Sequence, residues 1–324
     1  MALEQVLQPN EYEIRVKDDC NLWDQLAEIQ KKNGWTTQDL GTTSLLREMD
    51  TVTSLFIVRK KDNFLVGATV LIETEESVYA NVYVLRDGYR ASGLGMKLII
   101  RFQQQLGPSL ACKPLIARGA PAMMDKYKEE PFNGVHLYEM FYIKFQSKKE
   151  ILDFFPIEGV CSYALLSVRN LNPKQFNAFI EYDKMITGVN REKFLRNYYS
   201  LAFVEGIVMF DLKGTIRGVA GSVPTNGGDY MYKINPVYAE NSNDAAHLVH
   251  ALVNQIPFDA AEFVTHIRTQ SAGDCLLKRA RDVNKPLGLV GVLCSATNLD
   301  QIYTDRSNSS LIFAPTNSPA HFDG

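Results

Sequence analysis

The sequence predicts an α/β fold, of the α+β mixed-sheet kind, built from two related domains that each contain a twisted mixed sheet flanked by helices. Three observations lead to this fold class. Short apolar strands alternate with helical segments. The order of these elements in the first half recurs in the second half. Hydrophobic residues make up 46% and charged residues 22%, as in folded globular chains, and 324 residues suffice for two domains.

In the first half, strands are expected where Val, Ile, Tyr and Phe cluster, and helices where apolar residues recur at helical spacing. Asn21 is a candidate N-cap of the first helix, and Gly34 lies near the end of that helix. We expect strands at residues 12–16, 55–59, 64–72, 78–85, 114–117 and 137–145, and helices at residues 22–31, 94–106 and 123–128.

The second half repeats this pattern. Residues 56–72 and 207–223 each contain a strand, a polar turn and a second strand with a glycine, Gly67 or Gly218. A further strand and a helix follow in both halves at nearly the same spacing. The repeat predicts one fold used twice.

A charged and then apolar stretch that contains Pro156 and Gly159 separates the two halves. Such a change of composition is typical of a segment between domains. We therefore expect domains at residues 1–147 and 160–324, with a linker at residues 148–159.

Net charge and cysteine content restrict which binding partners and which cellular compartment the sequence predicts. The formal net charge is −3 and the pI is about 6.0, which favours neither nucleic acid nor an anionic membrane as a partner. The first ten residues lack the basic start and apolar run of a secretory signal. The five cysteines form no C-x-x-C pair, which favours free thiols in a reducing compartment. We expect this compartment to be the cytoplasm, and composition does not distinguish it from the nucleus. The oligomeric state stays open.

A glycine-containing loop carries the main functional signal. Arg90 to Gly95 reads R-x-x-G-x-G and lies between an expected strand and an expected helix. A helix N-terminus has backbone N–H groups without partners and the positive end of the helix dipole, so it attracts anions. Glycines at 93 and 95 let a phosphate approach the backbone. The loop is therefore a candidate anion site, and it lacks the Lys-Ser/Thr ending of a P-loop.

The stretch from Val84 to Leu98, VLRDGYRASGLGMKL, resembles motif A of the GNAT N-acetyltransferase superfamily. The resemblance implies an N-acetyltransferase that uses acetyl-CoA as a co-substrate. It implies that the end of the strand, at Val84 and Leu85, pairs with the pantetheine arm. It also implies that the CoA pyrophosphate is held by the loop residues Arg90, Ala91, Ser92, Gly93, Leu94 and Gly95.

The same resemblance suggests the proton-transfer groups. Tyr127 lies where GNAT proteins carry a tyrosine that protonates the departing thiolate, although it could also be a tyrosine packed at the domain edge. Glu75 and Glu76 follow a strand close to where general bases occur in the family. These two glutamates could equally form a solvated turn, with a water chain as the base.

The second half has lost the glycine loop. The alignment sets Tyr238 against Tyr89, Ala239 against Arg90, Ser242 against Gly93 and Asp244 against Gly95. A carboxylate and added Cβ atoms oppose a pyrophosphate, and Ser242 or Asn243 can cap the helix instead. We expect that this copy binds no CoA, closes over the first domain and helps to form the substrate pocket.

Tyr182 to Arg191 resembles a signature of tandem GNAT-like proteins, including a nematode-expanded group whose C-terminal module is degenerate. Asp183 and Arg191 could pair to fix a loop, or could face the cleft and select a charged substrate. The tail at residues 301–319 also resembles that group, which suggests an ordered terminus over the sheet.

These features favour an acyltransferase that moves an acetyl group from acetyl-CoA to a primary amine, by direct attack of that amine. A covered cleft favours a small metabolite as the acceptor. The alternative is a CoA-binding sensor or scaffold without turnover. We expect no metal, because His247 and His250 lack a third ligand with suitable spacing.

Overall fold

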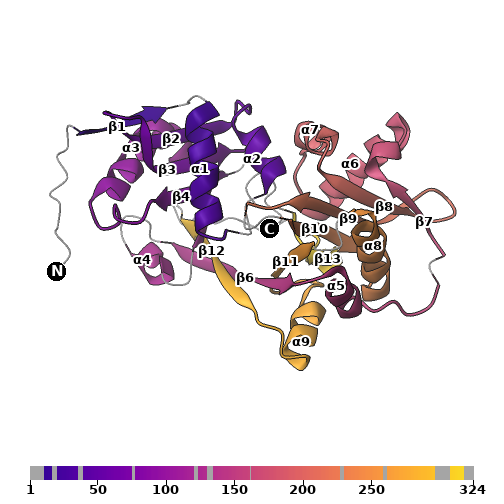
Figure 1. Cartoon of the computed structure of the whole chain (residues 1–324). Helices are drawn as coiled ribbons and strands as arrows, with labels where there is room; N and C mark the ends of the chain where they lie inside the picture. The colour runs from indigo at the N-terminus through magenta and orange to yellow at the C-terminus, as the bar shows by residue number, and fades with distance from the viewer. Residues whose placement is uncertain are drawn as a thin grey trace.

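The structure is a computed structural model, and it describes residues 11–16, 20–35, 39–74, 77–119, 123–129, 134–160, 162–226, 230–257, 261–295 and 307–316 (Figure 1). We call the elements from β1 to β6 the first module. They are β1 (Tyr12–Val16), α1 (Cys20–Lys32), α2 (Leu40–Leu46), β2 (Val52–Arg59), β3 (Phe64–Glu73), β4 (Val78–Leu85), α3 (Leu94–Leu110), β5 (Leu115–Gly119), α4 (Met124–Lys128) and β6 (Val135–Phe145).

A single helix, α5 (Lys148–Phe154), follows the first module, and the elements after it form the second module. They are β7 (Ala164–Ser167), the 3₁₀ helix η3 (Val168–Asn170), α6 (Pro173–Thr187), α7 (Glu192–Ser200), β8 (Glu205–Phe210), β9 (Ile216–Pro224), β10 (Met231–Ala239), α8 (Ser242–Gln255), β11 (Glu262–Arg268), α9 (Asp274–Asp282), β12 (Gly288–Ser295), η5 (Ser309–Leu311) and β13 (Ile312–Ala314).

The two modules have the same order of strands and α-helices, which confirms the expected fold class. Each runs strand, two helices, three strands, helix, strand, helix, strand, and the second module adds β13 at its end. In both, the three central strands form an antiparallel meander, and a parallel strand follows the helix. The fold is therefore a mixed sheet used twice, as the repeat in the sequence predicts.

The sheet does not stop at the end of the first module. Within the described residues it is a 13-stranded sheet, in the order β1-β2-β3-β4-β5-β12-β6-β11-β10-β9-β8-β7 with β13 on β10. Strand β12 from the second module lies between β5 and β6 of the first, and Figure 1 shows it beside β6. Strand β6 in turn pairs with β11. The modules thus complete one another, and the domain boundaries stated above stay a prediction.

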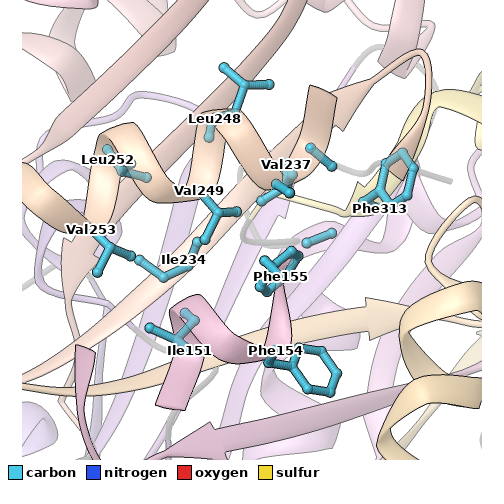
Figure 2. Close-up of a cluster of buried hydrophobic side chains, with 14 of the residues drawn as sticks. Ile151, Phe154, Phe155, Ile234, Val237, Leu248, Val249, Leu252, Val253 and Phe313 are labelled. Carbon is cyan, nitrogen blue, oxygen red and sulfur yellow. The ribbon is translucent and has the colours of Figure 1, made fainter. Parts of the chain in front are cut away.

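Helices cover both faces of each half of the sheet. In the first module α3 packs on one face and α1 on the other. In the second module α8 takes the place of α3, and α6 and α7 take the place of α1 and α2. Figure 2 shows Val249 of α8 next to Ile234 of β10, with Ile151 of α5 beside them, and Leu248 and Leu252 of α8 belong to the same buried cluster. Helix α5 therefore belongs to this core, although its residues were expected to form a linker.

Several expected elements differ from the observed ones. Helix α1 begins at Cys20, so Asn21 lies inside it and is not its N-cap. Helix α2 was missed, because its sequence LGTTSLL has few strong helix formers and is held by tertiary contacts with α7 and β9. Helix α3 runs four residues beyond the expected end and includes Pro108.

Two polar contacts join α1 and α2 to the second module. The ammonium of Lys233 on β10 lies 2.8 Å from the carboxylate of Asp39, and both side chains are buried. Asn226 donates a hydrogen bond of 2.8 Å to Gln30 on α1. Through these contacts the second module packs against α1 and the start of α2 of the first. No helix in the described part of the chain has the length and apolar character needed to span a membrane.

Candidate functional site

The expected cofactor strand, β4, separates from its parallel neighbour partway along. Strand β4 pairs with β3 up to Leu85, but it pairs with β5 only through Val78–Ala80. A β-bulge at Asn81, where the register with β3 shifts, follows at once. Strand β5 pairs with β12 on its other edge, over its whole length from Leu115 to Gly119. Among the described residues, no strand therefore pairs with the β5-facing edge of Val82–Leu85, and this open edge leads to the glycine loop.

The glycine loop has the backbone that its sequence requires. Ala91 has φ 61° and Gly93 has φ 79°, both in the left-handed region. Gly93 is the N-cap of α3 and offers no side-chain hydrogen bond to the helix. Ser92 turns its hydroxyl to the carbonyl of Tyr89, at 2.5 Å, and accepts only a 3.4 Å contact from Leu94 N–H. The first turn of α3 thus keeps donors for an outside anion.

Arg90 lies at the surface of this loop. Its side chain is 63% exposed and its guanidinium is 3.2 Å from the carboxylate of Asp87. An exposed pair of this kind contributes little to stability. Arg90 is therefore free to turn toward a ligand at small cost, and it does not hold the loop in shape. That role belongs to Tyr89, whose hydroxyl accepts a 3.0 Å hydrogen bond from Arg59.

Position 95 requires a glycine because the side chain of Tyr83 lies very close to the backbone there. A Cβ at this position would lie 2.5 Å from the hydroxyl oxygen of Tyr83, so the phenol of Tyr83 sits on the first turn of α3. Sequence reasoning did not single out Tyr83. The alternation of β4 could have found it, since Tyr83 and Leu85 share the face that packs against α3.

Tyr83 and Tyr127 share one neighbourhood. Tyr127 lies on the short helix α4, which follows β5, and is half-buried. Burial raises the pKa of Tyr127 above 10.0. Burial, and secondarily the charge of an ionised Tyr127, raise the pKa of Tyr83 to about 12. Both phenols thus stay protonated at neutral pH, which is the state that a proton donor needs.

Glu75 and Glu76 lie outside the described residues. The hairpin that flanks them is closed by Thr74 and Ser77, whose hydroxyls lie 3.0 Å apart. It is tied to the end of α3, because Ser109 donates a hydrogen bond of 2.7 Å to Glu73, and Lys113 just after the helix lies 2.8 Å from the same carboxylate. The hairpin is therefore at the opposite end of β4 from the glycine loop.

The second module contains the same split between strands. Strand β10 pairs with β11 only through Met231–Lys233, and a bulge at Asn235 and Pro236 follows. A Cβ on Gly218 would meet the carbonyl of Tyr238, as a Cβ on Gly67 would meet that of Val84. Tyr238 is thus the counterpart of Val84 within the strand. The expected match of Tyr238 with Tyr89 is wrong.

The glycine loop is absent from the second module rather than altered. Only Glu240 and Asn241 connect β10 to α8, where eight residues, 86–93, connect β4 to α3. The carboxamide oxygen of Asn241 accepts hydrogen bonds of 3.0 Å from the N–H groups of Asn243 and Asp244. The helix is therefore capped by Asn241, not by the expected Ser242 or Asn243. Asp244 is buried behind this cap, and burial raises its pKa.

Asp183 and Arg191 form a buried ion pair. The guanidinium donates two hydrogen bonds of 2.5 Å to the carboxylate, and both side chains are at most 3% exposed. Arg191 also donates to Thr316 at 2.9 Å and to Tyr238 at 3.2 Å. This geometry matches the first alternative, in which the pair fixes local structure. Neither group is placed to select a substrate.

Comparison with known proteins agrees with the fold and the repeat. A family model described as an acetyltransferase (GNAT) domain matches residues 179–270, in the second module. An uncharacterized protein of Caenorhabditis elegans is 26% identical over 314 residues, which cover 94% of this chain and 95% of the relative. Holothin acyltransferase of a Pseudoalteromonas species is 24% identical, over 72% of this chain and 73% of that enzyme.

A solved structure has the same architecture over nearly the whole chain. It is a tandem GNAT protein from the clavulanic acid biosynthesis pathway, with a TM-score of 0.65 and 11% identity. The match covers 88% of this chain and 98% of the tandem GNAT protein. Residues 179–270 thus match the GNAT acetyltransferase domain, and the chain as a whole has the fold of a tandem two-module GNAT protein.

Proposed function

We propose that the first module binds acetyl-CoA and transfers its acetyl group to a primary amine of a small metabolite. The observation that carries this proposal is the open edge of β4 beyond Ala80, which leads directly to the first turn of α3. An edge of this kind offers backbone N–H and C=O groups to an extended chain with amide groups. The helix N-terminus offers donors to a phosphate. The two features together fit the pantetheine and pyrophosphate parts of a CoA.

The residues of this site have different proposed roles. Amides from Arg90 to Gly95 would hold the pyrophosphate, and Val84 and Leu85 would position the pantetheine arm by backbone hydrogen bonds. The acyl-CoA, when bound, supplies the activated acyl group. A strand amide near Val84 would polarise the thioester oxygen. Tyr127 would donate the proton that the leaving thiolate needs.

The acceptor amine must lose a proton before it attacks. Glu75, Glu76 or a chain of water molecules would take it, as the sequence suggests. A small acceptor is supported by the contacts of Gln30 with Asn226 and of Asp39 with Lys233, through which the second module covers part of the first. It is further supported by the relative that is named as an acyltransferase of holothin.

Calorimetric titration with acetyl-CoA tests the proposed donor, and a screen of small amines and peptides in the presence of acetyl-CoA tests the proposed acceptor. Micromolar binding followed by acetylation of a small amine is expected. Binding without transfer to any amine would replace the enzyme by a CoA-binding sensor. Faster acetylation of peptides than of any small amine would overturn the choice of acceptor.

Substitution of Tyr127 by phenylalanine is expected to lower kcat by about 100- to 10,000-fold, the range of a lost general acid. The affinity for acetyl-CoA should stay unchanged. Because burial raises the pKa of Tyr127 above 10.0, an acid at this position is protonated up to that pH. The wild-type kcat should therefore fall only above pH 10, and the variant should lack that fall.

Two further variants make this test specific. Tyr230→Phe, at a 62% exposed tyrosine of the second module, should leave kcat unchanged. Tyr83→Phe should have a small effect if Tyr127 is the acid. A large loss in Tyr83→Phe together with a small loss in Tyr127→Phe would assign the acid to Tyr83 instead.

A further inference from the structure

In the second module, the space where β10 and β11 separate is filled by a strand from the C-terminal part of the chain. Strand β13 pairs antiparallel with β10, with Val237 opposite Ala314 and Tyr238 opposite Ile312. Strand β9 already occupies the other edge of these β10 residues, so β13 lies on the edge that faces β11. It also contacts β11. Since Tyr238 is the counterpart of Val84, β13 lies where the first module has its open edge.

The side chains of β13 fill both layers around this split. Ile312 is fully buried against Ile186 of α6 and Tyr238. The next residue, Phe313, points the other way into the core beneath α8, where Figure 2 shows it beside Val237. The two neighbouring residues thus face opposite sides of the sheet, as in a strand that belongs to it.

Polar contacts hold the segment at both ends. Gly273 donates its N–H to the carbonyl of Ile312 at 3.1 Å. Asn235, at the bulge, donates hydrogen bonds to the carbonyl of Pro315 at 2.5 Å and to that of His266 at 3.1 Å. The hydroxyl of Thr316 lies 2.7 Å from that of Tyr238 and accepts a bond from Arg191. The buried pair of Arg191 with Asp183 therefore also anchors the tail.

We infer that the second module is a peptide-binding cleft, and that its ligand is the chain's own segment Asn308–Thr316. An extended peptide and a pantetheine arm both present amide groups to a strand edge, so a cleft built for one can hold the other. The clefts of the two modules differ at the start of the helix that follows the strand. In the second module Asn241 caps α8, and no glycine loop follows β10. The second split thus has backbone and side-chain partners for a peptide strand and no site for a pyrophosphate.

One consequence rests on the proposed function of the first module. If that module binds acetyl-CoA, each chain binds one acetyl-CoA, with or without the segment in place. The peptide cleft itself does not depend on that function, so the two can fail separately.

Hydrogen exchange of the full-length chain tests the inference. In the wild type, β13 should protect those backbone amides of Val237–Ala239 that point toward it rather than toward β9. Phe313→Asp places a carboxylate in the core beneath α8, so it should release the segment and speed exchange at these residues by at least about tenfold. Exchange at residues 82–85 of β4 should not change. Thr316→Val removes the contacts with Tyr238 and Arg191 and should give a smaller acceleration of exchange. This variant replaces Phe313→Asp in the test if Phe313→Asp does not fold.

A synthetic peptide of residues 307–316 supplies the ligand in trans. Added in excess to the Phe313→Asp protein, it should restore slow exchange at the same amides of Val237–Ala239. A control peptide with Ile312 and Phe313 exchanged has the same composition but presents each side chain to the wrong layer, and it should not. Unchanged exchange in both variants, equal action of the two peptides, or a second acetyl-CoA bound by the Phe313→Asp protein would each overturn the inference.

Discussion

Replacement of Gly93 by aspartate is expected to weaken the binding of acetyl-CoA while the fold stays intact. Gly93 is exposed, has φ 79°, and a Cβ there meets no atom within 4 Å. Asn and Asp tolerate this conformation better than other residues with a side chain. A carboxylate about 4 Å from a phosphate costs about 1 kcal/mol in water and about 4 kcal/mol at an effective dielectric constant of 20. Affinity should thus fall roughly 5- to 1000-fold.

Two controls separate charge from backbone strain. Gly93→Asn has nearly the same shape without the charge and should retain most of the affinity. Gly214→Asp places the same residue at φ 78° in the β8–β9 turn, also with no atom within 4 Å, and should bind as the wild type does. Calorimetric titration of the three variants gives the comparison. Equal affinity of Gly93→Asp and the wild type would remove the pyrophosphate from this loop.

Replacement of Arg191 by methionine is expected to give the largest loss of stability. It leaves the carboxylate of Asp183 buried with its guanidinium partner removed, which typically costs about 3–5 kcal/mol. It also removes a donor from Thr316 and so loosens the C-terminal segment. Urea unfolding of the variant measures the loss as a lower midpoint.

The double variant Asp183→Leu/Arg191→Met should regain most of that stability, since a buried ion pair and an apolar pair of similar volume are often equivalent. Lys149→Met breaks a surface pair whose side chains are 84% and 64% exposed, and it should not shift the midpoint. An Arg191→Met protein as stable as the wild type would show that the buried pair is not formed in solution.

Local patterns in the sequence predicted much of the fold. The alternation of Val and Tyr in β4 and the two glycines at the start of α3 are local signals, and the strand, loop and helix they predict are present. The pairing of Gly67 with Gly218 was also correct, because each glycine allows a carbonyl of the next strand to approach.

Features that depend on distant parts of the chain could not be predicted in this way. Matching Tyr89 with Tyr238 failed because one tyrosine lies in a loop and the other in a strand, and six fewer residues connect β10 to α8 than connect β4 to α3. The contact of Tyr83 with Gly95 and the position of β13 depend on tertiary packing, which periodicity alone does not encode.

The exchange of β12 between the modules has a consequence for biosynthesis. One edge of β5 is completed only by residues 288–295, which are made long after β5 itself, at residues 115–119. At about 5–20 residues per second, the ribosome delivers β12 roughly 8–35 s after β5. During that interval the nascent first module exposes an apolar strand edge, so it should depend on chaperones. A gene fragment that encodes only residues 1–147 should for the same reason yield aggregated protein.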